Sequence, residues 1–109
     1  MTFNDYQERA KSTARYPNIG NNFIYPTLGL TGEAGEVADK VKKVIRDNNG
    51  IMDEEKRGLL MLEVGDVLWY VSQLAFELGY SLEEIAQANI AKLAARSEHG
   101  TIQGSGDLR

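Results

Sequence analysis

The chain has 109 residues, of which 42% are apolar and 26% charged, and its net charge is −4; these values fit one modest globular domain and argue against general nucleic-acid binding. The absence of cysteine excludes disulfides and thiolate metal sites. Because the sequence has neither a run of eighteen apolar residues nor a signal-like N-terminus, we expect no membrane association and a cytoplasmic location.

The hydrophobic periodicity predicts four helices and no strand, and therefore an all-α domain. The first helix is expected from about residue 3 to residue 14, with Thr2 as its N-cap. The second helix begins near Pro26, which suits a first helical turn, and ends before Asn48.

The two remaining helices follow from their end signals. Asp53 precedes the third helix, which runs to Leu78, and Gly79 ends it. A capping box of Ser81 and Glu84 opens the fourth helix, which runs to about residue 96. Residues 97–109 hold three glycines and are expected to form an irregular tail. Residues 1–109 therefore form a single domain without an internal linker.

Two pairs of acids are the most informative feature of these helices. Glu33 and Glu36 lie in the second helix, and Glu63 and Asp66 in the third. Their i, i+3 spacing places both members of a pair on one helix face. If the two helices pack antiparallel, the four carboxylates converge, which is unfavourable unless a cation neutralises them. Mg²⁺ prefers such oxygen ligands, so the pairs predict a metal site and chemistry on phosphates.

The second helix also carries glycines at every third position, Gly29, Gly32 and Gly35. Each glycine costs a helix roughly 0.5–1 kcal/mol relative to alanine. Three of them therefore indicate that something approaches this helix closely. Another backbone in a tight helix crossing and a bound ligand are both consistent with the pattern.

The third helix is apolar on two sides. One broad face is typical of a core-facing helix, and on another side Leu62, Trp69 and Phe76 recur every seven residues. A helix that is apolar on two sides is usually buried on both. Because its own chain covers one side, we expect a second subunit on the other, and hence a homo-oligomer.

The fourth helix places a polar residue, Asn89, in the middle of its apolar face, with Lys92 and Arg96 at the margin. A buried amide either makes structural hydrogen bonds or contacts a ligand, and both roles stay open for Asn89. Lys92 and Arg96 lie one turn apart on the same side, where they are suited to binding a polyphosphate.

Taken together, these motifs resemble the MazG-like, all-α nucleoside triphosphate pyrophosphohydrolases. The resemblance rests on the segment from Leu28 to Ala38, the segment from Glu63 to Tyr70, the Asn-x-x-Lys-x-x-x-Arg element that begins at Asn89, and the tail residues 104–109. It implies a MazG-type fold like a four-helix bundle that assembles as dimers or tetramers. It also implies hydrolysis of a nucleoside triphosphate to the monophosphate and pyrophosphate, with Mg²⁺, or Mn²⁺ in its place, as cofactor.

The resemblance further implies roles for individual residues. The metal ligands would be Glu33, Glu36, Glu63 and Asp66. Either Glu33 or Glu36 would activate the attacking water. The substrate contacts would be Tyr70, Asn89, Lys92 and Arg96.

Two other readings share part of this evidence. A related pyrophosphohydrolase that acts on phosphoribosyl-ATP or dUTP would have the same metal site and another substrate. A non-catalytic helical oligomerisation module would use the Leu62, Trp69 and Phe76 side but would leave the acidic pairs unexplained. A ferritin-like di-iron site requires Glu-x-x-His motifs, and no histidine lies near either acidic pair.

Overall fold

The computed structural model describes residues 1–100 and 103–107. Within them it contains no strand and four helices, α1 (Phe3–Lys11), α2 (Ile24–Asp47), α3 (Glu54–Glu77) and α4 (Leu82–Glu98). The prediction of an all-α domain is confirmed. α1 ends earlier than residue 14, because the hydroxyl groups of Ser12 and Thr13 donate to backbone carbonyls one turn back and so favour a turn.

Side-chain caps fix the start of three helices. The Thr2 hydroxyl accepts from the N–H of Asp5, whose carboxylate accepts from the N–H of Thr2, and this capping box opens α1. Ser81 and Glu84 form the same arrangement at α4. Asp53 accepts from the backbone N–H of the third residue after it, at the start of α3. These bonds satisfy N–H groups that a helix start leaves unpaired. They confirm the caps predicted at Thr2 and at Ser81 with Glu84.

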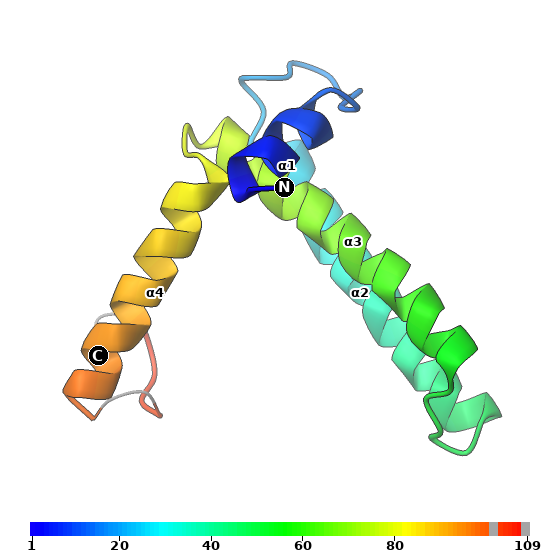
Figure 1. Cartoon of the computed structure of the whole chain (residues 1–109). Coiled ribbons are helices and arrows are strands. Elements are labelled where there is room, and N and C mark those ends of the chain that lie inside the picture. Colours follow the sequence, from blue (N-terminus) through cyan, green and yellow to red (C-terminus); the bar gives the residue numbers. More distant parts are fainter. Residues whose placement is uncertain (101–102, 108–109) are drawn as a thin grey trace.

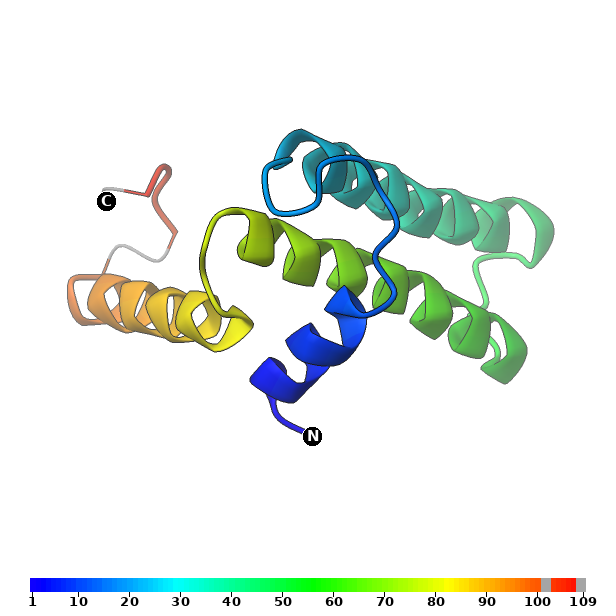
Figure 2. The same ribbon diagram turned by 90° about the horizontal axis from the view of Figure 1, so that it is seen from above.

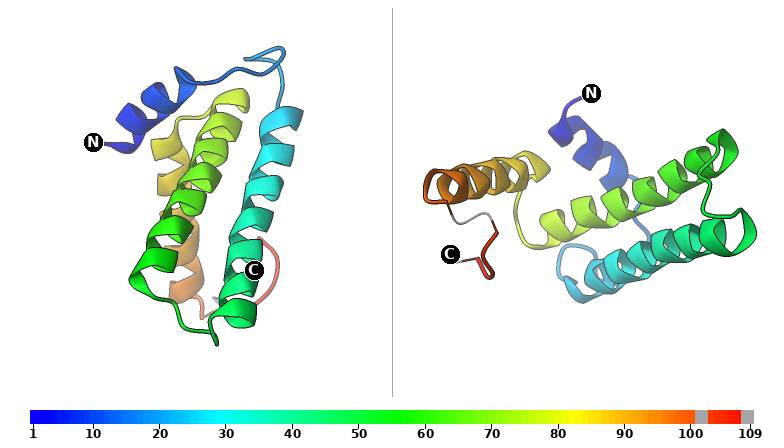
Figure 3. Two further views of the ribbon diagram at one scale, coloured as in Figure 1. Left: turned by 90° about the vertical axis from the view of Figure 1, so that its right-hand side faces the viewer. Right: turned by 90° about the horizontal axis from the view of Figure 1, so that it is seen from below.

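α2 and α3 form an antiparallel hairpin, and α4 leaves the end of α3 as a separate arm (Figure 1). α1 lies at the junction of the two arms, as the view from above shows (Figure 2). In the described part of the chain, α2 and α4 make no contact, and the right-hand view of Figure 3 shows α4 extending away from the hairpin. The radius of gyration is 16.7 Å, against roughly 13 Å for a compact domain of this length. The helices of one chain therefore do not close into a bundle.

The junction holds the small core of the chain. Gln7 of α1 is buried, and its side-chain amide donates to the carbonyl of Tyr80 at 3.1 Å and accepts from the N–H of Leu82 at 3.0 Å. These two bonds tie α1 to the turn between α3 and α4. Ala75 and Leu82 are buried beside it. The direction in which α4 leaves is thus set by hydrogen bonds as well as by packing.

Glu77, in the last turn of α3, organises the connector that leads to α2. Its carboxylate accepts from the Tyr16 hydroxyl at 2.6 Å and from the backbone N–H groups of Gly20 at 2.9 Å and Asn22 at 2.8 Å. Burial, followed by the hydrogen bond to Glu77, raises the pKa of Tyr16 to about 12. Tyr16 therefore remains a donor at neutral pH. Asn22 in turn accepts from the N–H of Tyr25, so this network positions the start of α2.

Large apolar side chains remain exposed on every arm. Those more than 60% exposed in the three long helices are Leu28, Ile45, Met61, Leu62 and Ile90. α1 and the turn after it partly cover the predicted side of Leu62, Trp69 and Phe76. The Trp69 indole N–H donates to the Thr13 hydroxyl at 2.8 Å, and the Lys11 ammonium lies 5.0 Å from the Phe76 ring centre. On that side, Leu62 is the member that stays largely exposed.

α3 is the one described helix that is long and apolar enough to cross a membrane, judged by length and composition alone. Glu63 and Asp66 lie near its middle, where carboxylates are costly in a bilayer. α3 also packs on both α2 and α1. We therefore interpret its apolar surface as a protein-contact surface.

Candidate metal and phosphate site

Three carboxylates meet on one side of the α2–α3 hairpin. Glu33 comes from α2, and Glu63 and Asp66 come from α3; each offers an oxygen, and these oxygens lie within 4.8 Å of one another. Glu33 and Glu63 are half-buried and Asp66 is exposed. The antiparallel pairing of two successive helices brings together acids that are thirty positions apart in the sequence. Three of the four acids that were expected to converge therefore do so.

The electrostatics of this group favour a cation. Burial raises the pKa of Glu33, and the negative charges of Asp66, Glu63 and Glu36 raise it further. Lys40 offsets part of the charge, with its ammonium 3.9 Å from a Glu63 oxygen. A hard divalent ion takes several carboxylate oxygens at once and relieves their mutual repulsion. The donor set, three carboxylates with no nitrogen or sulfur ligand, fits such an ion.

Glu36, the fourth acid, is not part of this group. It lies one turn beyond Glu33 on α2 and is exposed. Its charge is near enough to contribute to the raised pKa of Glu33. Glu36 therefore lies beside the three clustered acids, and its carboxylate oxygens are not part of their group.

A hollow of about 350 Å³ opens beside the acids. Its lining combines Glu33 and Asp66 with the side chains of Thr13, Trp69 and Tyr70. The Trp69 and Tyr70 rings meet edge to face, with centres 4.9 Å apart. An aromatic wall next to carboxylates can hold a flat ring beside a metal-bound phosphate chain.

Tyr70, one of the expected substrate contacts, thus lies next to the acids. Burial raises the pKa of Tyr70, and the neighbouring Tyr25 hydroxyl and the charges of Glu33 and Asp66 raise it further. The pKa of Tyr6 in α1 is also raised, first by burial and then by the charge of Asp66. Both phenols therefore stay protonated at physiological pH.

Three residues of this neighbourhood were not among the predicted site residues, namely Tyr6, Thr13 and Trp69. Trp69 was assigned to a subunit contact because of its seven-residue spacing with Leu62. Thr13 lines the hollow, and Tyr6 senses the charge of Asp66, only because α1 packs on α3. No local pattern in the sequence carries that information, since it depends on the crossing of two helices.

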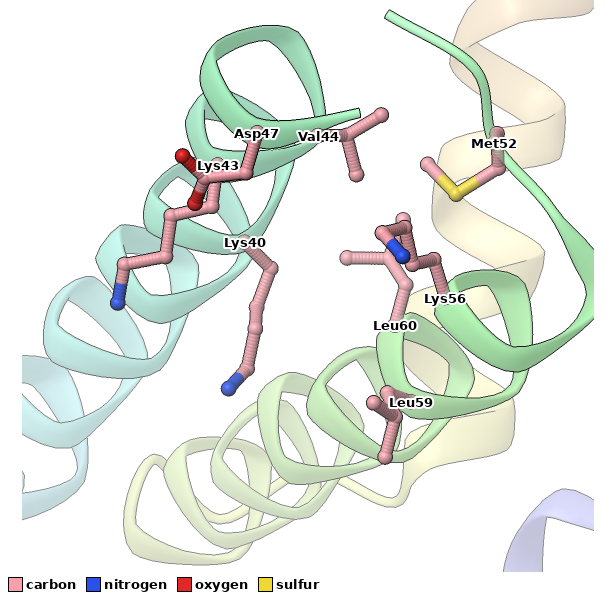
Figure 4. Close-up of a pocket in the computed structure, with 8 residues that line it drawn as sticks. All are labelled: Lys40, Lys43, Val44, Asp47, Met52, Lys56, Leu59 and Leu60. Carbon is pink, nitrogen blue, oxygen red and sulfur yellow. The ribbon is translucent and has the colours of Figure 1, made fainter. Parts of the chain in front are cut away.

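A second, smaller pocket of about 130 Å³ lies further along the hairpin (Figure 4). Its apolar lining is Val44, Met52, Leu59 and Leu60, and its charged lining is Lys40, Lys43, Lys56 and Asp47. Lys40 belongs both to this pocket and to the surroundings of Glu63. A predominantly basic region thus borders the acidic cluster on the same hairpin.

The residues predicted on α4 lie on the other arm. Asn89 is exposed, and with Lys92 it lines an open hollow of about 750 Å³ along α4. The expectation that Asn89 sits on a covered apolar face is not met within one chain, because the part of that face around Asn89 is uncovered: Ile90 is 64% exposed and Leu93 39%. Lys92 and Arg96 do lie together, and both bind the carboxylate of Asp107.

The comparisons with known proteins agree with this arrangement. The sequence matches the family description "MazG nucleotide pyrophosphohydrolase domain" over residues 26–101, a range that includes all three clustered acids and the cations of α4. The chain is 49% identical over 109 residues to the Gene 37 protein of Mycobacterium phage L5, covering 95% of this chain and 96% of that protein. No solved structure matches the chain. Because the family match spans more than half of its length, the chain belongs to the MazG nucleotide pyrophosphohydrolase family.

Proposed function

We propose that this protein hydrolyses a nucleoside triphosphate between its α- and β-phosphates, and that it releases the nucleoside monophosphate and pyrophosphate. Membership of the family supports a nucleotide pyrophosphohydrolase. The observation that carries the proposal is the convergence of Glu33, Glu63 and Asp66 from two helices on one point. The substrate class, the Mg²⁺ dependence, the cytoplasmic location and the assembly described below are parts of the proposal.

The metal ion would be held by Glu33, Glu63 and Asp66, whose oxygens already lie together. A bound Mg²⁺ neutralises phosphate charge, which is the chief requirement of phosphoryl chemistry. Mn²⁺ has similar ligand preferences and is expected to substitute for it.

Glu36 is the residue best placed to accept the proton of the attacking water. It lies next to the cluster without sharing in it, so an oxygen remains available for a hydrogen bond to water. The water oxygen forms a bond to the α-phosphorus while the bond from that phosphorus to the bridging oxygen breaks. The proton passes to Glu36, and the bridging oxygen leaves with the pyrophosphate.

The leaving pyrophosphate needs cations to stabilise its charge. Lys92 and Arg96 are the paired cations of α4. In one chain α4 diverges from the hairpin (Figure 1), and Arg96 lies fourteen residues, or about 21 Å along the helix axis, from the start of α4. We therefore propose that α4 of one subunit lies over the hairpin of another, so that the acids and the cations of one site come from different chains.

The exposed apolar residues support this assembly. Ile90 and Leu93 are uncovered on α4, and Leu62 and Val64 are uncovered on α3 next to Glu63. Pairing the two arms between subunits would bury both surfaces, which is the main favourable term in protein association. It would also place Asn89, now exposed, near the acids of the other subunit.

The experiment is hydrolysis of a panel of nucleoside triphosphates with Mg²⁺, followed as pyrophosphate release. We expect release that EDTA abolishes, and we expect Glu63→Gln and Asp66→Asn to lower it by at least about 100-fold, a typical loss when charge stabilisation is removed. Glu55→Gln is the matched control, since Glu55 is exposed in the first turn of the same helix. Turnover at the parental rate in both site variants would refute the proposal.

A further inference from the structure

The tail of the chain places a carboxylate on the two cations of α4. The Lys92 ammonium donates to Oδ1 of Asp107 at 2.9 Å, and the Arg96 guanidinium donates to the same oxygen at 3.1 Å. Arg96 also donates to the carbonyl of Gly106 at 3.2 Å. One anionic oxygen thus lies at the point where both positive side chains converge.

A phosphate oxygen would make the same contacts as Oδ1 of Asp107. Carboxylates and phosphates both accept charge-assisted hydrogen bonds from lysine and arginine. The hydrogen bonds from Lys92 and Arg96 lower the pKa of Asp107. Asp107 is therefore an anion at neutral pH and competes for these cations with any phosphate that approaches them.

The burial of the three side chains shows how this competition works. The Arg96 side chain is only 6% exposed and Lys92 is 39% exposed, whereas Asp107 is 80% exposed. Because Oδ1 of Asp107 occupies the point where Lys92 and Arg96 converge, a phosphate oxygen can take that place only when the contact with Asp107 opens. Ion pairs with an exposed partner contribute little stability, so a ligand with several negative charges is able to displace Asp107.

We propose that Asp107 is an internal competitor for the phosphate-binding pair, closed on Lys92 and Arg96 in the resting protein and displaced by a polyphosphate. This inference rests on the proposed function, from which it takes the phosphate-binding role of the two cations. Because a ligand must replace the carboxylate of Asp107, ligands that bring more than one negative charge to Lys92 and Arg96 bind better than ligands with a single charge. A nucleoside triphosphate and pyrophosphate bring more than one charge, and a monophosphate does so less well.

The test is the binding of inorganic pyrophosphate to the full chain, measured by isothermal titration calorimetry without divalent ions. Removing the competitor with Asp107→Asn should tighten binding about 3- to 10-fold, because a weak ion pair no longer reduces the fraction of open sites. Glu98→Gln is the matched control: it changes the net charge equally at an exposed position in the last turn of α4. It should leave the affinity within about twofold of the parent, since exposed charges are screened.

Two further variants decide where the effect arises. The gain from Asp107→Asn should be smaller in a Lys92→Met background, because one of the two cations for which Asp107 competes is then absent. Asp107→Ala should behave like Asp107→Asn, with the helical circular dichroism unchanged, since the replaced side chain is exposed. Unchanged or weaker binding in both Asp107 variants would overturn the proposal, and so would a failure of every variant to bind pyrophosphate.

The outcome is separable from that of the proposed function, because the binding measurement needs no turnover. Tighter pyrophosphate binding in Asp107→Asn without any hydrolysis of triphosphates would leave the competition intact and refute the enzyme activity. Metal-dependent hydrolysis of triphosphates, with no change of pyrophosphate affinity in Asp107→Asn, would support the enzyme activity and refute the competition by Asp107.

Discussion

Tyr70 of α3 lies directly against the backbone of α2 at Gly29. A β-carbon added to Gly29 would overlap the Cδ1, Cε1 and Cζ atoms of the Tyr70 ring, whereas one added to Gly32 or Gly35 would meet no described atom within 4 Å. The close approach expected from the three glycines is thus found at one of them, and the approaching group is an aromatic side chain. The absence of a side chain at Gly29 allows Tyr70 to lie beside the acids.

Gly29→Ala should therefore lower the free energy of unfolding by about 1–3 kcal/mol, since the Tyr70 ring must move out of a packed position. Gly32→Ala is the control in the same helix: open space surrounds that position, so alanine should stabilise the helix by up to about 1 kcal/mol. The free energies of unfolding of both variants are measured by urea denaturation. Equal free energies of unfolding for the two variants would contradict this prediction, because they would mean that the Tyr70 ring can move away from residue 29 without loss of stability.

The parts of the fold that the sequence predicts well are local. Thr2, Asp53 and Ser81 cap helices through bonds that span three residues, so their chemistry is visible in a short window. The convergence of Glu33 with Glu63 and Asp66 was also predictable, because two long helices joined by a short turn pack antiparallel. Their i, i+3 spacing puts both acids of a pair on one helix face, so the two pairs meet when these faces are turned toward each other.

The parts that escaped prediction depend on contacts between distant segments. The divergence of α4 follows from the bonds that Gln7 makes to Tyr80 and Leu82, more than seventy positions away. The contact of Asp107 with Lys92 and Arg96 arises in an irregular tail, where no periodicity indicates which side chain turns inward. The resemblance implies an oligomeric fold like a four-helix bundle, and a single chain provides its four helices in two separate arms.

Glu36→Gln should separate metal binding from turnover. Glu36 lies outside the group of three acids, so Mn²⁺ or Mg²⁺ should still raise the melting temperature of this variant. Hydrolysis should fall by about 100- to 10,000-fold, the usual contribution of a general base. In Glu63→Gln the thermal shift itself should be lost. If Glu36→Gln also abolished the thermal shift, Glu36 would be a metal ligand and Glu33 the remaining candidate for the base.

Sites shared between subunits should be restored by mixing two inactive variants. Asp66→Asn removes an acid of the hairpin, and the double substitution Lys92→Met with Arg96→Met removes the cations of α4. Co-expressed, the two chains form mixed dimers in which one site combines an intact hairpin with an intact α4. If the parent is a two-fold symmetric dimer, random pairing makes about half of the dimers mixed, and about half of the sites in these work. The preparation then regains about a quarter of the parental pyrophosphate release.

The control for this experiment is the same pair of variants purified separately and assayed without exchange of subunits. It should show no activity above that of either variant. If co-expression also gave none, the acids and cations of a working site would belong to one chain. Sedimentation of the parent as a monomer at micromolar concentration would refute the assembly directly.

Glu77 provides a pH dependence of stability that is independent of the metal site. Burial alone would raise its pKa, but the hydrogen bonds from Tyr16, Asn22 and Gly20 outweigh burial and lower the pKa below the ordinary value of 4.5. A carboxylate with a lowered pKa contributes stability that is fully present above its unfolded pKa. The contribution is lost as the pH falls through the lower pKa of the folded state.

Glu77→Gln carries no charge at any pH, so it cannot gain or lose this contribution. At pH 7 it should be less stable than the parent by about 1–3 kcal/mol, the usual cost of weakening hydrogen bonds to a charged group. The free energy of unfolding of both proteins should be measured with urea from pH 7 to pH 3. Their difference should be constant above pH 4.5 and should shrink below it, because protonation of Glu77 removes from the parent the stability of a charged carboxylate, which the variant never has. Glu55→Gln, at an exposed position of the same helix, should track the parent throughout. A stability difference between Glu77→Gln and the parent that stayed constant down to pH 3 would mean that the packing of residue 77, and not the charge of its carboxylate, holds the connector in place.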